Sequence, residues 1–467
     1  MNESHLRELI DEPGRRHEVS AMELLEAFLT RIDANRRLAA FITVTADQAR
    51  DAAREADRRR ARGIEPRPLD GIPVAVKDNI DVAGVPATAG SAWFRNRVPR
   101  RDAVVARRLR GAGAVIVGKN NMHELAYGAT SVNPHFGACR NAWDDERLAG
   151  GSSGGSGVAL GADMCLAALG TDTGGSVRLP AALNGVTALR PTYGSVSNRG
   201  VQPISPSLDT VGSMARSACD VATLARAIAG YDPRDPYALA PPSPGPVERL
   251  DDARPLRGLR VAVASGYFFD DVEPRVAANA YGVADALGKL GASLERVDTA
   301  DAGRANADCS LLIAAEALAV HERRLARDPS AVGEDVRRRL ELGRAASGVD
   351  VARALDRMRH WQARMRVTLA RVDMILTPTA PVVAPPLAGA ETIATTARLT
   401  ALTYPWSLAG LPAISLPSGL GEDGLPTGVQ LAAAPWRDEL LLSTGIALQR
   451  LTGWHRERPA RRVSSPA

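Results

Sequence analysis

Two glycine-rich segments in the middle of the chain constrain its fold more than any other feature. Residues 150–157 read Gly-Gly-Ser-Ser-Gly-Gly-Ser-Gly, and residues 170–180 read Gly-Thr-Asp-Thr-Gly-Gly-Ser-Val-Arg-Leu-Pro. Glycine clusters where the backbone takes unusual dihedral angles or approaches a ligand closely. Consecutive N–H groups in such a loop can bind an anion, including the oxyanion of an acyl-transfer intermediate. Ser152 and Ser176, one in each segment, are therefore candidate nucleophiles.

A serine nucleophile needs a base that removes its proton as it attacks. The strand-like segment 71–76 leads directly into Lys77. A lysine at the end of a buried strand can act as a base, because burial disfavours its ammonium form. A surface ion pair between Lys77 and Asp78 is the alternative, since most lysines are solvated. Of the seven histidines, only His123 and His135 lie near the glycine-rich segments in the sequence, so a Ser-His-Asp triad stays open.

Lys77, Ser152 and Ser176 lie, in that order, within motifs that resemble the amidase signature family. The resemblance is carried by ordered blocks along most of the chain. These blocks are residues 68–79, 117–124, 150–156, 170–180, 185–194, 207–216, 408–415 and 426–430. The resemblance implies an α/β fold in which a central twisted mixed β-sheet is covered by helices on both faces.

The resemblance also implies a Ser–Ser–Lys triad. Ser176 would be the nucleophile, Ser152 the bridging serine whose peptide bond is cis, and Lys77 the base. Neutral Lys77 would take a proton from Ser152, which takes one from Ser176. The expected oxyanion hole consists of the backbone amides of Thr173, Gly174, Gly175 and Ser176.

Residues beside the triad are expected to support it. In the family, an acid and an arginine at the positions of Asp172 and Arg178 brace the loop that carries the nucleophile, here the second glycine-rich segment, residues 170–180 (the nucleophile loop). Ser153 is a further supporting residue. Asp78 would raise the pKa of the adjacent base if its carboxylate were close. We expect its side chain to point away, because adjacent residues of a strand face opposite sides. Arg190 stands where the family usually has lysine, and we expect it to affect packing rather than chemistry.

The resemblance implies that a variable helical region, residues 309–371, helps to shape the substrate pocket. This region carries many arginines, but acids alternate with them, which favours a solvated helical face over a nucleic-acid surface. Trp406 is equally compatible with a place in the core. The candidate substrate-binding residues are Met122, Tyr127, Tyr404 and Trp406.

Short apolar strands alternate with helices from Gly71 to about Gly230, which indicates an α/β sheet. We expect one amidase domain over residues 1–467. Its parts are an N-terminal helical region (1–65), the signature core (66–232), an exposed linker (233–255), an α/β segment (256–308), the variable helical region (309–371) and the C-terminal part of the core (372–467).

Composition fits an enzyme that works in the cytoplasm. Apolar residues make up 45% of the chain, which is enough for a sizeable core. The formal net charge is a modest +5, and no apolar run approaches the ~18 residues of a membrane-spanning helix. The four cysteines lack the spacing of a metal site. We therefore expect no metal, no cofactor and no membrane or nucleic-acid partner. The apolar spacing near residues 439–451 is compatible with a homodimer contact or with the core.

The resemblance to the amidase signature family implies an amidohydrolase that cleaves the C–N bond of a small carboxamide-type substrate, which is an amide, anilide, carbamate or hydrazide. One alternative is the A subunit of a glutamine-dependent tRNA amidotransferase, in which we expect an acid shortly before the block 408–415. Residues 397–404 contain no acid, which argues against glutamine. A second alternative, a catalytically silent binding protein, is disfavoured by the intact triad.

Overall fold

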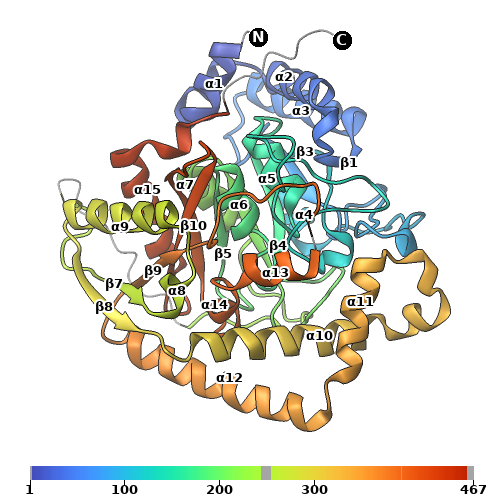
Figure 1. Cartoon of the computed structure of the whole chain (residues 1–467). Coiled ribbons are helices and arrows are strands. Elements are labelled where there is room, and N and C mark those ends of the chain that lie inside the picture. The colour runs from blue at the N-terminus through green and yellow to red at the C-terminus, as the bar shows by residue number, and fades with distance from the viewer. Residues whose placement is uncertain (1–2, 243–253, 391, 460–467) are drawn as a thin grey trace.

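A single mixed sheet runs through the molecule (Figure 1). The computed structural model describes residues 3–242, 254–390 and 392–459. Within these residues the sheet has 11 strands in the order β1-β3-β2-β4-β6-β5-β10-β11-β9-β7-β8. The pairs β2–β3, β2–β4, β7–β8 and β7–β9 are parallel, and the others are antiparallel. The predicted mixed α/β architecture is confirmed.

The strands are β1 (Phe41–Val44), β2 (Pro73–Lys77), β3 (Val115–Asn120), β4 (Ala167–Asp172), β5 (Thr187–Arg190), β6 (Thr210–Ala215), β7 (Arg260–Ser265), β8 (Ser293–Asp298), β9 (Met374–Pro378), β10 (Ala413–Leu420) and β11 (Pro426–Ala433). The α-helices are α1 (Glu3–Asp11), α2 (Ala21–Ala34), α3 (Ala46–Ala61), α4 (Val104–Gly111), α5 (Gly154–Gly161), α6 (Arg178–Asn184), α7 (Ala218–Ile228), α8 (Tyr267–Asp270), α9 (Pro274–Lys289), α10 (Ala302–Arg327), α11 (Glu334–Leu342), α12 (Gly348–Leu369), α13 (Thr392–Thr400), α14 (Tyr404–Leu408) and α15 (Asp438–Thr452).

Helices cover both faces of the sheet because its central strands are apolar on both sides. In β2, Val74 and Val76 join the core packed by α4, α7, α9 and α15, whereas Ala75 joins the core packed by α2, α3, α5 and α6. In β10, Ile414 belongs to the first of these cores. Ala413, on the other face, packs into a third core with α8, α10, α12 and α14. The alternation along each strand therefore holds both helical layers in place.

The N-terminal region, residues 1–65, contains helices α1–α3 and also strand β1, which pairs with β3 at one edge of the sheet. Residues 256–308 contain β7, α8, α9, β8 and the beginning of α10. The rest of α10 lies in the variable region 309–371 and packs along α12, and α11 lies between them in the sequence (Figure 1). Of the linker expected at 233–255, residues 243–253 lie outside the described part of the chain.

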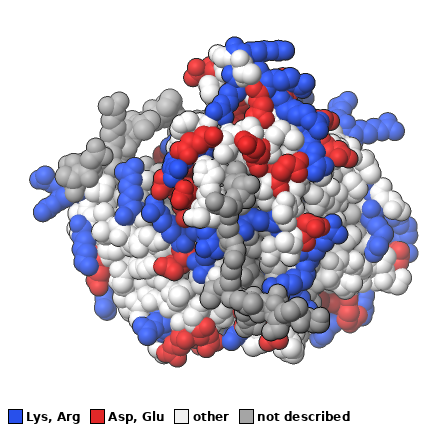
Figure 2. Space-filling view, turned by 90° about the horizontal axis from the view of Figure 1, so that it is seen from above, with Lys and Arg blue, Asp and Glu red and all other residues white. Residues whose placement is uncertain are grey.

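Basic and acidic side chains are interspersed on the surface seen in Figure 2. Ion pairs of this kind join Arg50 to Glu26 and, in the variable region, Arg337 to Glu341. The alternation of arginines with acids expected for that region is therefore present in the fold. Among the residues that the structure describes, no helix is long and apolar enough to cross a membrane.

Candidate active site

Lys77 is the last residue of β2 and is fully buried. Its Nζ lies 2.7 Å from Ser152 Oγ and 2.8 Å from Thr171 Oγ1. Burial lowers the pKa of Lys77 from its ordinary value of 10.5 to about 7, although the charges of Asp209 and Asp172 oppose this change. A substantial fraction of Lys77 is therefore neutral near pH 7, as a proton acceptor must be.

The Asp78 side chain is directed away from Lys77, as expected. It accepts a hydrogen bond from Lys119 Nζ at 3.1 Å and one from the Thr88 backbone amide at 2.8 Å. Lys119 and Asp78 form a fully buried ion pair. Because this carboxylate has its own cation, it does not hold Lys77 in the ammonium form.

Ser152 lies in the loop that leads into α5, and the Gly151–Ser152 peptide bond is cis. The expected cis geometry is present. The loop is fixed by backbone hydrogen bonds: the His123 amide donates to the Ser152 carbonyl oxygen at 3.0 Å, and the Ser153 amide donates to the Ser176 carbonyl oxygen at 3.1 Å. The second of these bonds joins the two glycine-rich segments directly.

Ser176 precedes α6 and is partly exposed, whereas the residues around it are buried. Among the described residues, the hydroxyls of Ser152 and Ser176 do not form a hydrogen bond with each other. Catalytic hydrogen bonds are often long without a substrate and tighten when one binds. The hydrogen bond between Lys77 and Ser152 is therefore formed in the structure, and Ser176 is the partly exposed member of the three residues.

The two glycines before Ser176 allow another segment of the chain to approach the loop. A Cβ atom at Gly174 would lie 2.2 Å from Tyr404 Cε1, and one at Gly175 would lie 2.3 Å from Thr403 Oγ1. Gly175 also has a φ of +126°, which residues with side chains rarely adopt. The start of α14 therefore packs directly against the nucleophile loop.

The expected set of oxyanion donors needs one correction. The Gly175 N–H donates to Asp172 Oδ1 at 2.8 Å, so it is directed at a carboxylate and not toward the space beside Ser176. An N–H engaged by a buried carboxylate is a poor donor to a second anion. The amides of Thr173, Gly174 and Ser176 remain as proposed donors.

Asp172 is the anchor of the nucleophile loop. Arg178 contacts both of its carboxylate oxygens, with Nε and Nη2 each at 3.0 Å. Arg190 Nη1 contacts Asp172 Oδ1 at 3.1 Å, and all three side chains are fully buried. Burial opposes the ionisation of Asp172, but the two guanidinium groups hold its pKa below the usual range. Arg178 also reaches Gln430 Oε1 and Ser407 Oγ, both at 2.8 Å, which ties the loop to β11 and α14.

Arg190 supports the structure of the nucleophile loop through a charged contact. Its position at the end of β5 brings its guanidinium to the loop carboxylate, and its Nη2 also donates to the Leu208 carbonyl oxygen at 2.9 Å. A basic residue at a position where the family usually has lysine was the available signal. Its partner could not be identified from the sequence, because Asp172 is 18 residues away.

The four candidate pocket residues lie in different environments in the structure. Tyr404 packs on Gly174 of the nucleophile loop. Tyr127 is mostly buried and lies beneath the Arg339 guanidinium, whose Cζ is 6.0 Å from the ring centroid. Met122 is fully buried, next to Gly90.

Trp406, the fourth candidate, is a core residue and not a pocket wall. It has no exposed surface, and its ring stacks on Phe268 with the centroids 4.8 Å apart and the planes 9° from parallel. Its position two residues after Tyr404, within the short helix α14, turns it away from the loop on which Tyr404 packs. Both residues are aromatic, and the sequence contains no signal that separates these two environments.

The two histidines near the glycine-rich segments are engaged elsewhere. His123 Nε2 lies 2.9 Å from Asp335 Oδ2, and His135 Nε2 lies 3.0 Å from Glu124 Oε1. Within the described residues, neither ring forms a hydrogen bond with Ser152 or Ser176. The alternative of a Ser-His-Asp triad therefore has no support in the geometry.

Two polar residues of the site were not singled out from the sequence. Thr171 accepts hydrogen bonds from Lys77 Nζ and from Asn79 Nδ2, at 2.8 and 3.2 Å. Asp209 accepts a hydrogen bond of 2.5 Å from Thr173 Oγ1, beside the nucleophile. Both lie inside family-like blocks, but nothing in a single sequence distinguishes them from their neighbours.

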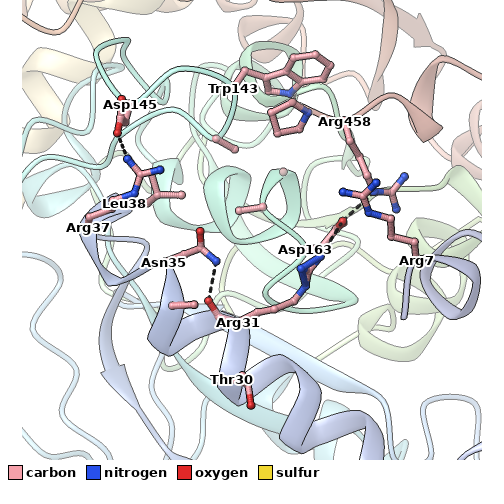
Figure 3. Close-up of a pocket in the computed structure, with 15 residues that line it drawn as sticks. Arg7, Thr30, Arg31, Asn35, Arg37, Leu38, Trp143, Asp145, Asp163 and Arg458 are labelled. Carbon is pink, nitrogen blue, oxygen red and sulfur yellow. Dashed lines mark hydrogen bonds and ion pairs between the residues drawn. The ribbon is translucent and has the colours of Figure 1, made fainter. Parts of the chain in front are cut away.

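A cavity of about 360 Å³ lies elsewhere in the molecule, between the N-terminal helices and the last described residues (Figure 3). Asp163 lies on its wall and forms a 2.8 Å ion pair with Arg458. Arg31 also lines it, 3.9 Å from the same carboxylate. Its lining residues include none of the triad, so this cavity is separate from the candidate active site.

Comparison with known proteins agrees with this geometry. The family model described as Amidase matches residues 23–442. The A subunit of the glutamyl-tRNA(Gln) amidotransferase of Chloroflexus aggregans (strain MD-66 / DSM 9485) is 38% identical over 95% of both chains. A solved structure from a vestigial protein complex that reveals the evolutionary origins of an s-triazine catabolic enzyme is 36% identical, with a TM-score of 0.87, over 96% of this chain and 98% of that chain. A crystal structure of an amidase is 32% identical, with a TM-score of 0.82, over 97% of this chain and 100% of that one. The expected family is confirmed: the chain belongs to the amidase signature family of enzymes, which act on carbon–nitrogen bonds.

Proposed function

We propose that this protein is a serine amidohydrolase that opens the C–N bond of a small carboxamide through an acyl-enzyme on Ser176. The observation that carries the proposal is the fully buried Lys77, whose Nζ lies 2.7 Å from the hydroxyl of Ser152 at the cis peptide bond. A buried amine with a pKa near 7 next to a serine hydroxyl is suited to accept and return a proton. The partly exposed Ser176 is the group that a substrate can reach.

The proposed reaction proceeds in two halves. Ser176 Oγ attacks the carbonyl carbon, its proton passes to Ser152 Oγ, and the Ser152 proton passes to Lys77 Nζ. The negative charge on the former carbonyl oxygen is stabilised by the amides of Thr173, Gly174 and Ser176. The C–N bond then breaks as the proton returns through Ser152 to the leaving nitrogen. In the second half, water attacks the acyl-enzyme by the same proton transfers and releases the carboxylic acid.

Each supporting residue has a part in this reaction that follows from its contacts. Asp172, held by Arg178 and Arg190, fixes the loop that carries the nucleophile and the proposed amide donors. Ser153 donates its backbone amide to the Ser176 carbonyl oxygen, and its Oγ lies 3.2 Å from the Thr171 carbonyl oxygen. The site is thus held by bonds among its own loops, so that the transition state is stabilised by groups already in place.

The test is a screen of amides, anilides, esters and carbamates with purified protein, run with and without hydroxylamine. We expect turnover of at least one class and diversion of the acyl group to a hydroxamate, because a covalent ester is open to any small nucleophile. Ser176→Ala should abolish both. Ser156→Ala is the matched control, because Ser156 lies in the other glycine-rich segment and its hydroxyl bonds Asn120 Oδ1 at 3.2 Å and the Leu169 carbonyl oxygen at 3.4 Å, not a triad side chain. Full hydroxamate formation by a folded Ser176→Ala protein would refute the proposal.

A second candidate is the A subunit of an amidotransferase that takes ammonia from glutamine, which the 38% identity to the Chloroflexus protein favours. The comparisons therefore give no support to the expected absence of a nucleic-acid partner. Against glutamine stands the segment 397–404, which has no acid and contains Tyr404, the residue that packs on the nucleophile loop. An acid in this segment would lie beside the site, so its absence bears on the substrate.

Glutaminase activity separates the two candidates. We expect the purified chain to release no ammonia from glutamine while it hydrolyses another amide. Affinity purification from the source cells with a C-terminal tag, followed by mass spectrometry, reports any subunits, which also matters because the s-triazine-related structure comes from a protein complex. Co-purification with other amidotransferase subunits, together with glutaminase activity, would establish the second candidate instead.

A further inference from the structure

Asp209 is a buried carboxylate directly beside the nucleophile loop. It immediately precedes β6, and 7% of its surface is exposed. Its Oδ1 accepts the hydrogen bond from Thr173 Oγ1 at 2.5 Å. Its Oδ2 accepts the backbone amides of Ile204 and Ser205 at 2.9 and 3.1 Å. Asp209 therefore joins the loop that carries the nucleophile to a second loop, in front of β6.

Asp209 lacks the kind of partner that a buried carboxylate normally has. Buried charges in proteins are usually paired, and Asp172, on the same loop, contacts two guanidinium groups. Within the described residues, by contrast, no lysine, arginine or histidine forms an ion pair with Asp209. Only neutral donors contact its oxygens.

The groups that face Asp209 come from several elements. Thr173 faces it from the loop after β4, Tyr193 from the segment after β5, and Glu316 from α10. Lys77, at the end of β2, is the nearby cationic group: its Nζ contacts Thr171 Oγ1, two residues before the Thr173 that bonds Asp209. Strands β4 and β6 pair at Asp172 and Thr210, directly beside Asp209, and the charge of Asp209 raises the pKa of Lys77 against the effect of burial. Lys77 likewise has hydroxyl contacts and no ion pair among the described residues.

We propose that Asp209 is a positioning residue of this site with two roles. Its carboxylate holds the Thr173 hydroxyl of the nucleophile loop, and it is the counter-ion of the Lys77 ammonium without contacting it. The inference rests on the proposed function and names a further residue on which that reaction depends. When Lys77 takes the proton of the nucleophile, a positive charge forms in a buried place. The fixed negative charge of Asp209 stabilises it without a contact that would hold Lys77 in the ammonium form beforehand.

The pKa shifts that burial causes in the two groups agree with this arrangement. Burial raises the pKa of Asp209 to about 6, although the hydrogen bonds from Thr173 and the two amides oppose the change. Burial lowers the pKa of Lys77 to about 7. Two groups that interact and lose their protons in adjacent pH ranges titrate as a coupled pair. At a pH above the ranges in which both groups lose their protons, Lys77 is neutral and Asp209 is charged, which is the state that the reaction requires.

The test is the pH dependence of kcat/KM in Asp209→Asn. Removing the negative charge disfavours the ammonium form of Lys77, so the acidic limb of the profile should move to lower pH by about half a unit or more. Thr173→Val keeps the carboxylate and removes only the hydroxyl, so it should lower kcat about tenfold or more without moving the limb to lower pH. Asp438→Asn is the matched control: it removes a carboxylate that likewise accepts from a threonine hydroxyl and a backbone amide, both of Thr192, but lies at the start of α15, and it should leave the limb in place.

A limb in Asp209→Asn that coincides with the wild-type limb would overturn the counter-ion role. A wild-type kcat in Thr173→Val would overturn the positioning of the loop. Should Asp209→Asn fail to fold, as judged by its thermal melting, Asp209→Ser removes the charge with a smaller side chain and gives the same comparison. If neither charge-removing variant folds, the catalytic proposal is overturned in favour of a purely structural role.

A second readout separates this inference from the proposed function. A fluorophosphonate probe labels an activated serine irrespective of the substrate, so its rate of reaction with Ser176 can be followed across the pH range. Absence of labelling in the wild-type protein would refute the proposed function itself. Labelling of the wild-type protein with an acidic limb that Asp209→Asn leaves unmoved would refute only the role of Asp209.

Discussion

Replacement of Lys77 by methionine should change how stability depends on pH, and it tests whether the base is neutral in the folded protein. The perturbation removes the ionisable amine and keeps a side chain of similar length and shape. Lys77 has an ordinary pKa of 10.5 in the unfolded chain and a pKa of about 7 in the folded one. This difference corresponds to about 4–5 kcal/mol between the two protonation states.

The sign follows from proton binding. Between pH 7 and 10.5 the unfolded chain holds more protons on Lys77 than the folded protein does, so the wild-type free energy of unfolding rises with pH in this window. Below the folded pKa the full cost of placing this lysine in the core is present, and above 10.5 it vanishes. Methionine has no such dependence. The lost contacts to Ser152 and Thr171 add an offset that does not vary with pH.

The assay is urea unfolding of both proteins at pH 7, 8 and 9, with the difference in unfolding free energy obtained from the midpoints. The advantage of Lys77→Met over wild type should shrink by about 2 kcal/mol from pH 7 to pH 9. Lys289→Met is the control, because Lys289 is exposed and its replacement should give a difference that is flat over this range. A difference for Lys77→Met that is equally flat would show that Lys77 remains an ammonium in the folded protein, and the proposed base would have to be abandoned.

Three further substitutions probe the surroundings of the triad. Arg190→Lys should lower the free energy of unfolding in urea titrations by about 1–3 kcal/mol, because an ammonium cannot contact Asp172 and a backbone carbonyl at once as the guanidinium does. An unchanged midpoint would show that the Arg190–Asp172 ion pair does not stabilise the fold. Gly174→Ala should lower kcat about 100-fold, because its Cβ would lie 2.2 Å from Tyr404 Cε1, and Tyr404→Ala in the same chain should restore part of the rate; wild-type kcat in the single variant would contradict this. Thr171→Val removes a hydroxyl that contacts the base at 2.8 Å, so the acidic limb of kcat/KM should move to lower pH, and a shift in the opposite direction would contradict the assignment.

The resemblance to the amidase signature family predicts the triad, and each of its members also has a local signal. Lys77 follows an apolar run that is typical of a buried strand, and the two serines lie in glycine-rich loops. The fold brings Lys77 and the nucleophile loop together through two neighbouring strands. Strands β2 and β4 are parallel neighbours, so their carboxyl ends meet at one edge of the sheet. Lys77 ends one of them, and the nucleophile loop begins where the other ends.

The rest of the site depends on contacts between distant segments, which leave no local pattern. Arg190 is identified as a partner of Asp172 only when the antiparallel pairs β4–β6 and β5–β6 place their strands side by side. Trp406 and Tyr404 differ only in the direction in which a short helix presents them. The Gly175 N–H was a reasonable oxyanion donor from its position, and the three-dimensional structure alone places the Asp172 carboxylate on it.

These long-range contacts also suggest a segment in which we expect substrate preference to be set. The triad comes from the first half of the chain, whereas Thr403 and Tyr404, which touch the two glycines before the nucleophile, come from the second half. The segment that would have to supply an acid for glutamine is the same one that packs on the nucleophile loop. A change of substrate within this fold therefore does not require a change in the triad. We expect a change in the turn between α13 and α14 and in Tyr404 to alter the substrate, because Thr403 and Tyr404 lie against the two glycines before Ser176.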